Sequence, residues 1–342
     1  MKHDFFYVGG GASKTPEEVA LLQKKYDIFD KETIQTIFKD VLNINVKNIV
    51  KPSIVGLPHV TYFVEGSDDK EYCFRANLGN EKPELELVIE KLASDLAREN
   101  DIKSNKILFV DCSRKKYSFD FQIQEKLSGE NPEHNFRGTQ KDYDKISFDL
   151  GQIIAKLSFI KFEGFGRFDK TTALAENRLK TTMVSNYEYI TLELDTQVKE
   201  ILNAKLINDQ QADAIIRTFA TSKELLDIKQ GSMVHYDLAD HNLFYDPVSF
   251  GIVGIFDWEA VCVSDPLLDL ASAPTWKTLY ERESVMLEGF KSIAKLPDNY
   301  KEKMDLYRLR TCIWKAVHNI RFDILNQERS QRFYNALLPF KI

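Results

Sequence analysis

The chain has 342 residues, 43% of them hydrophobic and 12% aromatic, which is enough for two lobes that each have a hydrophobic core. Its 46 basic and 52 acidic residues give a net charge of −6, which argues against a general nucleic-acid binder. No run of apolar residues approaches the roughly 18 needed for a membrane span.

The cysteines are scattered at Cys73, Cys112, Cys262 and Cys312, and none forms a CxxC pair that would indicate a zinc or redox motif. The N-terminus has an aspartate at position 4 and only a short apolar run, so it does not resemble a secretory signal. We therefore expect reduced thiols and a cytoplasmic location.

Residues 1–48 are expected to form a helical segment that packs on the lobe after it. In TPEEVALLQKKYDIF, residues 15–29, a capping threonine is followed by proline and, three residues after the cap, by glutamate. The stretch DKETIQTIFKDVL, residues 30–42, predicts a second helix.

Residues 49–127 read as a small antiparallel-sheet lobe with one main helix. Three strands are predicted in residues 48–78, separated by a tight turn at 56–58 and a polar turn at 66–70. Helical spacing follows in KPELELVIEKLASDLAREN. Two further strands are predicted in KILFVDC and YSFDFQIQEKL.

Residues 128–342 read as a larger, mainly helical lobe, with helical patterns at about 171–230 and 276–342. Two polar segments interrupt the helices. The first is the loop MVHYDLADHNLFYD at 233–246, which holds two of the chain's six histidines. The second is a short apolar strand at 252–259 that ends in polar residues.

The loop matches the pattern HxDxxxxN with His235, Asp237 and Asn242. Phosphoryl transfer needs a carboxylate for the acceptor hydroxyl and oxygen ligands for magnesium on the nucleotide phosphates. Asp257 supplies a second magnesium carboxylate, directly after the apolar strand. The competing HxHxDH metal motif does not fit, because position 237 is aspartate.

VHYDLADHNLFYD and IVGIFDWEAVCVSDPLLDLA together resemble the aminoglycoside phosphotransferase family. The resemblance implies an α+β, bilobal, protein-kinase-like fold. It also implies that Asp237 is the catalytic base, that Asn242 and Asp257 hold Mg²⁺, that His235 braces the loop, and that Asp269 is a buried aspartate that pins it.

The predicted nucleotide lobe carries weaker similarities. IVGLPHVTYFV resembles the family's nucleotide-positioning loop, where Gly56 matches but Pro58 and His59 replace the usual serine and asparagine. This leaves phosphate contacts to the backbone of Gly56 and His59. FQIQEKLSGE resembles the linker between lobes, where backbone groups near Glu125 and Leu127 would bind adenine or guanine.

EYCFRANL resembles the family's third strand, with Arg75 in the place of the basic residue that meets the phosphates. A guanidinium stays charged and can bind phosphate with two hydrogen bonds. Its partner is open between Glu84, Glu86 and Glu90, and we favour Glu86.

The resulting hypothesis is a cytoplasmic enzyme that transfers the γ-phosphoryl group of ATP or GTP, with Mg²⁺, to a hydroxyl of a small molecule. The family resemblance favours an aminoglycoside or similar antibiotic, hence antibiotic resistance. A metabolic kinase for choline, ethanolamine, sugars or amino alcohols is the alternative. We place acceptor specificity in the helices at about 171–230 and 276–342.

Two further alternatives differ in chemistry. A protein kinase is disfavoured, because only twelve residues separate Asp257 from Asp269 and leave no room for a long activation segment. A catalytically silent binding protein would usually lack the base or a metal ligand. Here Asp237, Asn242 and Asp257 are all present. The oligomeric state stays open.

Overall fold

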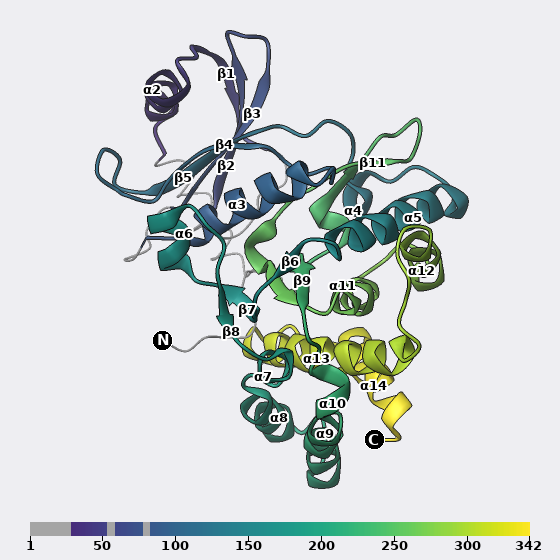
Figure 1. Ribbon diagram of the computed structural model, residues 1–342. Coiled ribbons are helices and arrows are strands. Elements are labelled where there is room, and N and C mark those ends of the chain that lie inside the picture. Colours follow the sequence, from purple (N-terminus) through teal and green to yellow (C-terminus); the bar gives the residue numbers. More distant parts are fainter. Residues whose placement is uncertain (1–28, 53–58, 78–82) are drawn as a thin grey trace.

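The computed structural model describes residues 29–52, 59–77 and 83–342, and it shows a small sheet lobe joined to a larger helical lobe (Figure 1). The elements of the small lobe are α2 Lys31–Leu42, β1 Val46–Val50, β2 Val60–Gly66, β3 Glu71–Asn77, α3 Glu86–Glu99, β4 Ile107–Asp111 and β5 Asp120–Glu125. The helix expected at 15–29 and the turn expected at 56–58 lie outside the described residues, apart from Phe29.

The small lobe is built on a five-stranded antiparallel sheet with the order β1-β2-β3-β5-β4. Buried residues alternate along β2, as expected for a strand with one face on a core. Ile37 and Phe38 of α2 join Tyr62 and Phe74 of the sheet in one hydrophobic cluster. The helix predicted at 30–42 therefore packs on this lobe.

Helix α3 connects the two lobes. Its buried residues Ile89, Ala93 and Ala97 belong to the hydrophobic cluster of the large lobe rather than to that of the small lobe. The indole N–H of Trp258, on the large lobe, donates to the Ser104 hydroxyl just beyond α3 at 2.9 Å. Helix α3 and the residues just after it therefore pack against the large lobe.

The large lobe holds the remaining elements. Its helices are α4 Pro132–Asn135, α5 Gln140–Leu157, α6 Lys170–Glu176, α7 Asn186–Ile190, α8 Leu194–Asn203, α9 Asp209–Thr221, α10 Lys223–Leu226, α11 Leu267–Ser272, α12 Glu283–Lys291, α13 Tyr300–Arg321 and α14 Gln327–Leu337. Short 3₁₀ helices are η1 Asp240–Asn242, η2 Trp258–Ala260, η3 Ala273–Thr275 and η4 Leu338–Phe340.

This lobe also contains short strands, and the sequence pattern predicts only the one within residues 252–259. They are β6 Lys161–Phe162, β7 Phe165–Phe168, β8 Thr181–Met183, β9 Gly231–Val234, β10 Leu243–Tyr245, β11 Ile252–Ile255 and β12 Cys262–Ser264. A five-stranded sheet has the order β6-β9-β12-β7-β8, and β10 pairs with β11. The prediction of helices throughout 171–228 is therefore wrong at β8, which pairs with β7 in the sheet.

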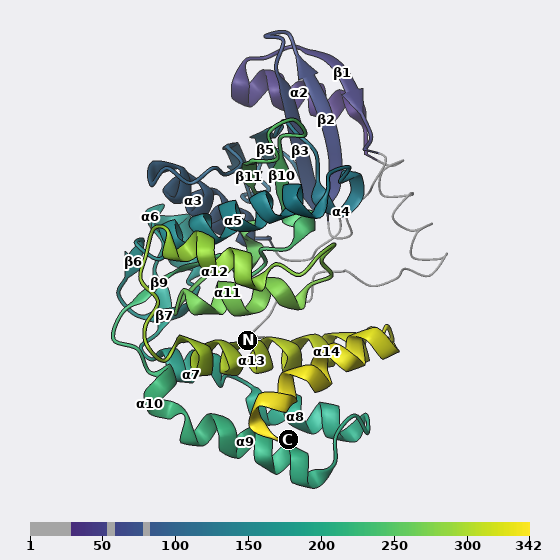
Figure 2. The same cartoon turned by 90° about the vertical axis from the view of Figure 1, so that its right-hand side faces the viewer.

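Two glycines let α5 and α12 cross closely, and both views show these helices side by side (Figures 1 and 2). A Cβ atom on Gly151 would lie 2.0 Å from the Met286 carbonyl oxygen. One on Gly289 would lie 2.0 Å from the Phe148 carbonyl oxygen. Only residues without a side chain permit this approach.

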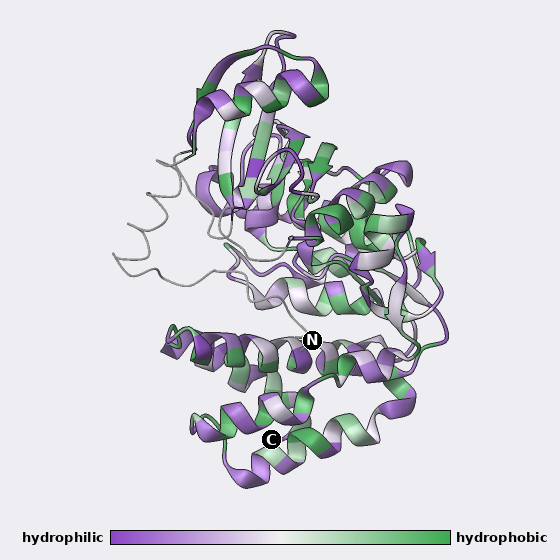
Figure 3. Ribbon diagram, turned by 90° about the vertical axis from the view of Figure 1, so that its left-hand side faces the viewer, coloured by the Kyte–Doolittle hydropathy of each residue, from purple (hydrophilic) through white to green (hydrophobic). Residues whose placement is uncertain are grey.

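Among the described residues, no helix combines the length and the apolar character that crossing a bilayer would require. Figure 3 shows hydrophilic and hydrophobic residues mixed along the helices of both lobes.

Candidate active site

The loop between β9 and β10 is held in place by the Asp269 side chain of α11. The Asp269 carboxylate accepts hydrogen bonds from the backbone N–H groups of His235 at 2.9 Å and Tyr236 at 2.7 Å. Tyr236 has a left-handed φ of 71°, an unusual conformation for a bulky residue. Asp269, which the sequence predicts to support this loop, therefore stabilises a backbone conformation at Tyr236 that is itself unfavourable.

His235 ties this loop to the strand that precedes Asp257. Its Nδ1 accepts from the Asp237 backbone N–H at 3.3 Å, and its Nε2 lies 3.1 Å from the Phe256 carbonyl oxygen, to which it donates. The ring packs on Trp258 with the centroids 4.4 Å apart. Burial lowers the pKa of His235 to about 4, so the imidazole is neutral and has a bracing role.

Asn242 positions the Asp237 carboxylate. Its side-chain amide donates to the backbone carbonyl of Asp237 at 2.9 Å and to the carboxylate Oδ2 at 2.8 Å. The amide oxygen of Asn242 therefore points away from Asp237. Burial and the nearby charge of Asp257 raise the pKa of Asp237, while the His241 charge opposes them.

Three carboxylate oxygens of the site are buried without a hydrogen-bond partner among the described residues: Glu90 Oε1, Asp237 Oδ1 and Asp257 Oδ1. Asp257 sits at the end of β11 with a left-handed φ of 68°. Glu90, Asp257 and Glu259 offer carboxylate oxygens within 4.8 Å of one another. Unpaired buried oxygens are costly, and a hard divalent cation binds such oxygens, so these residues fit Mg²⁺.

The structure corrects the predicted partner of Arg75. Its Nη1 donates to Glu90 Oε2 at 3.0 Å, and its Nη2 donates to Glu259 Oε1 at 3.2 Å. Glu86 instead pairs with Lys170 on the surface. Glu86 and Glu90 are one helical turn apart on α3, and only Glu90 lies deep enough to reach β3.

His59, which replaces the family's usual asparagine, also binds Arg75. Its Nδ1 accepts from Arg75 Nη2 at 3.0 Å, and its Nε2 lies 3.1 Å from both carboxylate oxygens of Glu84. The three glutamates considered as partners of Arg75 therefore have different roles. Glu90 pairs with Arg75, Glu84 with His59, and Glu86 with Lys170. Gly56 lies outside the described residues.

The segment that joins the lobes begins where β5 ends. The backbone N–H of Glu125 donates to the Lys106 carbonyl at 2.9 Å, so this donor is already used. The N–H and C=O of Leu127 have no hydrogen-bond partner within the described part of the chain. A Cβ on Gly254 would lie 2.8 Å from Leu127, which places that residue against β11.

Residues that no motif indicated lie beside Asp237. His241 Nε2 is 4.0 Å from Asp237 Oδ2, and its Nδ1 is 3.2 Å from Glu133. Burial disfavours the His241 charge, but Glu133 and Asp237 outweigh it and raise its pKa. The His241 ring meets Trp276 edge-on at 5.4 Å, and Lys315 Nζ lies 3.4 Å from the Trp276 ring centroid. Trp276 follows η3 and Lys315 lies on α13, and neither segment carries a sequence motif.

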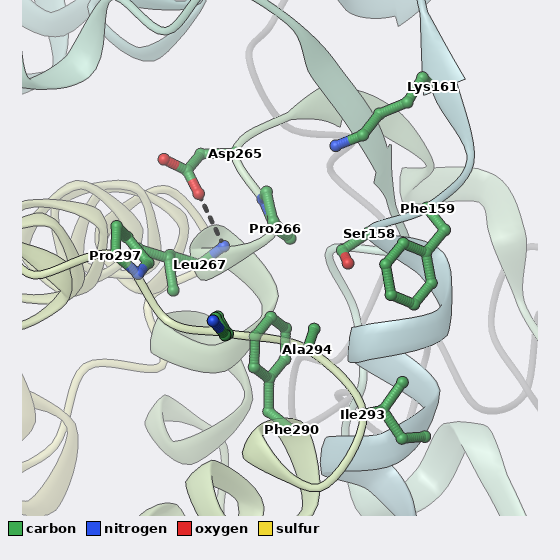
Figure 4. Close-up of a pocket in the computed structure, with 11 residues that line it drawn as sticks. Ser158, Phe159, Lys161, Asp265, Pro266, Leu267, Phe290, Ile293, Ala294 and Pro297 are labelled. Atoms are coloured by element: carbon green, nitrogen blue, oxygen red, sulfur yellow. Dashed lines mark hydrogen bonds between the residues drawn. The ribbon is translucent and has the colours of Figure 1, made fainter.

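A cavity of about 420 Å³ lies elsewhere in the large lobe, at the end of α5 (Figure 4). Ser158, Lys161, Asp265 and Phe290 are among its lining residues, and the Leu267 backbone N–H donates to Asp265 at 3.0 Å. None of the residues assigned to phosphoryl transfer lines this cavity.

Comparison with protein families finds that the model of the phosphotransferase enzyme family (APH) matches residues 56–292. A comparison with curated proteins finds no match.

Solved structures share the fold at low identity. The putative fructosamine-3-kinase from Thermobifida fusca is 12% identical, with 90% of this chain and 100% of that chain covered at a TM-score of 0.64. The aminoglycoside phosphotransferase APH(4)-Ia is 11% identical, with 92% of this chain and 100% of that chain covered at a TM-score of 0.65. The macrolide 2′-phosphotransferase MphH from Brachybacterium faecium is 13% identical, with 90% of this chain and 98% of that chain covered at a TM-score of 0.56. These likenesses confirm the predicted α+β kinase-like fold.

Proposed function

The chain belongs to the phosphotransferase enzyme family, a family of small-molecule kinases, and from this premise we propose that it transfers the γ-phosphoryl group of ATP or GTP to a hydroxyl of a small molecule. The observation that carries the proposal is the buried oxygen Asp237 Oδ1, which has no partner among the described residues. Asn242 holds the other oxygen, so Oδ1 is left to accept the acceptor's hydroxyl proton.

Asp257 and the amide oxygen of Asn242 would hold Mg²⁺ in this proposal. The bound ion would neutralise charge on the nucleotide phosphates. His235 and Asp269 keep Asp237 and Asp257 in fixed relative positions, since His235 bonds both to the loop and to the carbonyl just before Asp257.

The nucleotide is proposed to lie between the lobes. Arg75, aligned by Glu90, would bind phosphate oxygens, together with backbone groups of Gly56 and His59. The free backbone groups of Leu127 support a contact to the base there. The boundaries 1–48, 49–127 and 128–342, and a location in the cytoplasm, belong to this proposal.

Two acceptor classes are proposed from the sequence. One is an aminoglycoside or similar antibiotic, which would make the protein a resistance enzyme, and three of the similar structures are named for aminoglycoside, macrolide and fructosamine substrates. The other is a metabolic acceptor: choline, ethanolamine, a sugar or an amino alcohol. The cations beside Asp237 disfavour cationic acceptors, which include choline, ethanolamine and amino alcohols as well as the aminoglycosides, and they favour the sugars of the second class.

The first test is release of nucleoside diphosphate by the purified protein with magnesium and ATP or GTP. The panel of acceptors contains aminoglycosides, macrolides, choline, ethanolamine, sugars, sugar acids and amino alcohols. The Asp237→Ala variant serves as the blank, and general-base loss should lower turnover by about 10²–10⁴-fold. Acceptor-stimulated release of equal size in the variant would contradict the proposal. Nucleotide binding without any release would support the catalytically silent alternative.

A further inference from the structure

A series of cationic and aromatic groups in mutual contact begins beside Asp237. His241 lies between the Asp237 carboxylate and the edge of Trp276. The Trp276 ring in turn has the Lys315 ammonium over its face, 3.4 Å from the centroid. A cation at this distance is attracted by the ring's negative face.

Lys315 has no carboxylate within 4.0 Å of its Nζ among the described residues, although burial makes its charge expensive. Its hydrogen bond at 2.7 Å goes to the neutral hydroxyl of Thr275. Arg332 donates to the backbone carbonyl of the same Thr275 at 3.3 Å. Two cations thus meet at one residue, and their mutual repulsion opposes the charged form of Lys315.

A second unsatisfied donor lies in the same place. The Trp276 indole N–H is buried and has no hydrogen-bond partner within the described residues. Asp237 attracts the Lys315 ammonium but makes no ion pair with it within 4.0 Å, and Glu133 is already paired with His241. The group therefore has donors and positive charge to offer, and it lacks an acceptor.

This group adjoins Asp237 through His241, whose Nε2 lies 4.0 Å from Asp237 Oδ2. Arg75 pairs with Glu90 and Glu259, and these two carboxylates lie within 4.8 Å of that of Asp257, which marks the proposed nucleotide side. The charge of Lys315 acts on Asp237. Asp237 thus stands between the two sets, as a base that must reach both phosphate and acceptor would.

We propose that the acceptor carries an anionic group, a carboxylate or a phosphate, that binds the ammonium of Lys315 beside Trp276 while its hydroxyl binds Asp237. The inference rests on the proposed function and deepens it by giving the charge of the acceptor. An anion there satisfies Lys315 and the indole N–H together. An ammonium group there would face the Lys315 ammonium, which has no carboxylate within 4.0 Å among the described residues.

The first experiment compares acceptors that differ in charge on one skeleton: glucuronate, glucose 6-phosphate, glucose and glucosamine, with glycerate, glycerol and serinol as a smaller set. The expected preference in kcat/KM is anionic over neutral over cationic. Lys315→Gln should raise KM for the anionic acceptor at least about tenfold and leave KM for ATP unchanged. Lys315→Arg should restore most of the loss, and Lys301→Gln, an exposed lysine on the same helix, is the matched control.

A binding experiment covers the case in which no panel member is turned over. Fluorescence of Trp276 is followed while malonate, inorganic phosphate, spermidine or kanamycin is added at constant ionic strength. A saturating non-hydrolysable ATP analogue with magnesium occupies the nucleotide side. Trp276→Phe identifies the reporting indole. We expect the anions to change the signal in the wild type and in Lys301→Gln, and to lose at least about tenfold in affinity in Lys315→Gln.

The outcomes separate the inference from the function. Turnover of an aminoglycoside or amino alcohol in preference to its matched anion would overturn the anionic acceptor and leave the kinase intact. Equal anion affinity in wild type and Lys315→Gln would also overturn it. Anion binding that depends on Lys315, with no nucleotide turnover, would support the anion site and contradict the kinase. Binding of malonate but not of inorganic phosphate would identify the anionic group of the acceptor as a carboxylate.

Discussion

Glu86 and Glu90 offer a test of how Arg75 is held, because they lie one turn apart on α3 and differ in burial. Glu90→Gln removes the charge paired with Arg75 at 3.0 Å. Charge-assisted hydrogen bonds contribute about 1.5–3 kcal/mol, so we expect KM for ATP to rise about tenfold or more. Glu86→Gln, which affects only the contact to the exposed Lys170, should change KM less than about twofold.

Steady-state kinetics with both nucleotide and acceptor varied would measure this. Thermal unfolding of both variants controls for loss of structure, since Glu90 is fully buried. A larger effect of Glu86→Gln than of Glu90→Gln would contradict the assigned pairing.

The reason why the sequence alone could not select Glu90 is geometric. Residues four apart face the same side of a helix, so periodicity places Glu86 and Glu90 equally. Their depth depends on how α3 docks on the large lobe. By contrast, the positions of His235, Asp237, Asn242, Asp257 and Asp269 follow from spacing within short segments, and the structure brings all five together.

If the acceptor is anionic, the pKa of Lys315 predicts how KM for that acceptor depends on pH. Burial lowers this pKa to about 7, from an ordinary value of 10.5. The ammonium that binds an anion is therefore present below about pH 7 and lost as the pH rises through 7. We expect KM for a carboxylate acceptor such as glucuronate to rise with pH across this range.

The charged groups around Lys315 are Asp237, Arg332 and His318, and Cys312 is the other titratable neighbour. Lys315→Arg keeps its charge at all these pH values, so its KM should stay nearly constant. Any dependence left in that variant would report His241, whose pKa is raised. A KM that falls with rising pH in the wild type would have the wrong sign for the assignment.

Among elements, the crossing of α5 and α12 determines the shape of the large lobe. Gly151→Ala and Gly289→Ala each place a Cβ 2.0 Å from a carbonyl oxygen, so the helices must separate. Overpacking of this kind costs about 1–3 kcal/mol. We expect lower unfolding temperatures in both variants, measured by calorimetry.

Gly251→Ala is the matched control, since its Cβ would meet its nearest atom at 3.5 Å, an ordinary contact. It should leave the unfolding temperature almost unchanged. Equal stability of all three variants would contradict the close crossing.

The helices and the five strands of the small lobe follow from residue pattern, whereas the sheet of the large lobe does not. Its strands have two to four residues, too few for a period-2 alternation to be recognised. They also carry buried residues on both faces, as in β9, where all four are buried. Such runs resemble buried helix segments, and their pairing depends on tertiary contacts.

For the whole molecule, the arrangement of two lobes around Asp257 predicts how nucleotide binding affects stability. A ligand that binds only the folded protein stabilises it by about 2.7 kcal/mol at a hundred times its dissociation constant. ATP with magnesium contacts both lobes in our proposal, through Arg75 and Asp257. We therefore expect a clear rise in unfolding temperature with ATP and magnesium, and a smaller one with ATP in the presence of a chelator.

Asp257→Ala separates this effect from the chemistry. The variant removes a metal ligand, so the additional stabilisation by magnesium should disappear together with phosphoryl transfer. Asp237→Ala should keep the stabilisation and lose only turnover, because the base is not needed to bind nucleotide. In the absence of ligand, Asp257→Ala is expected to be no less stable than the wild type, since Asp257 Oδ1 is a buried carboxylate oxygen that no described residue satisfies. A variant that retained the full magnesium-dependent shift would show that the ion binds elsewhere, with Glu90 and Glu259 as the remaining carboxylates of the cluster.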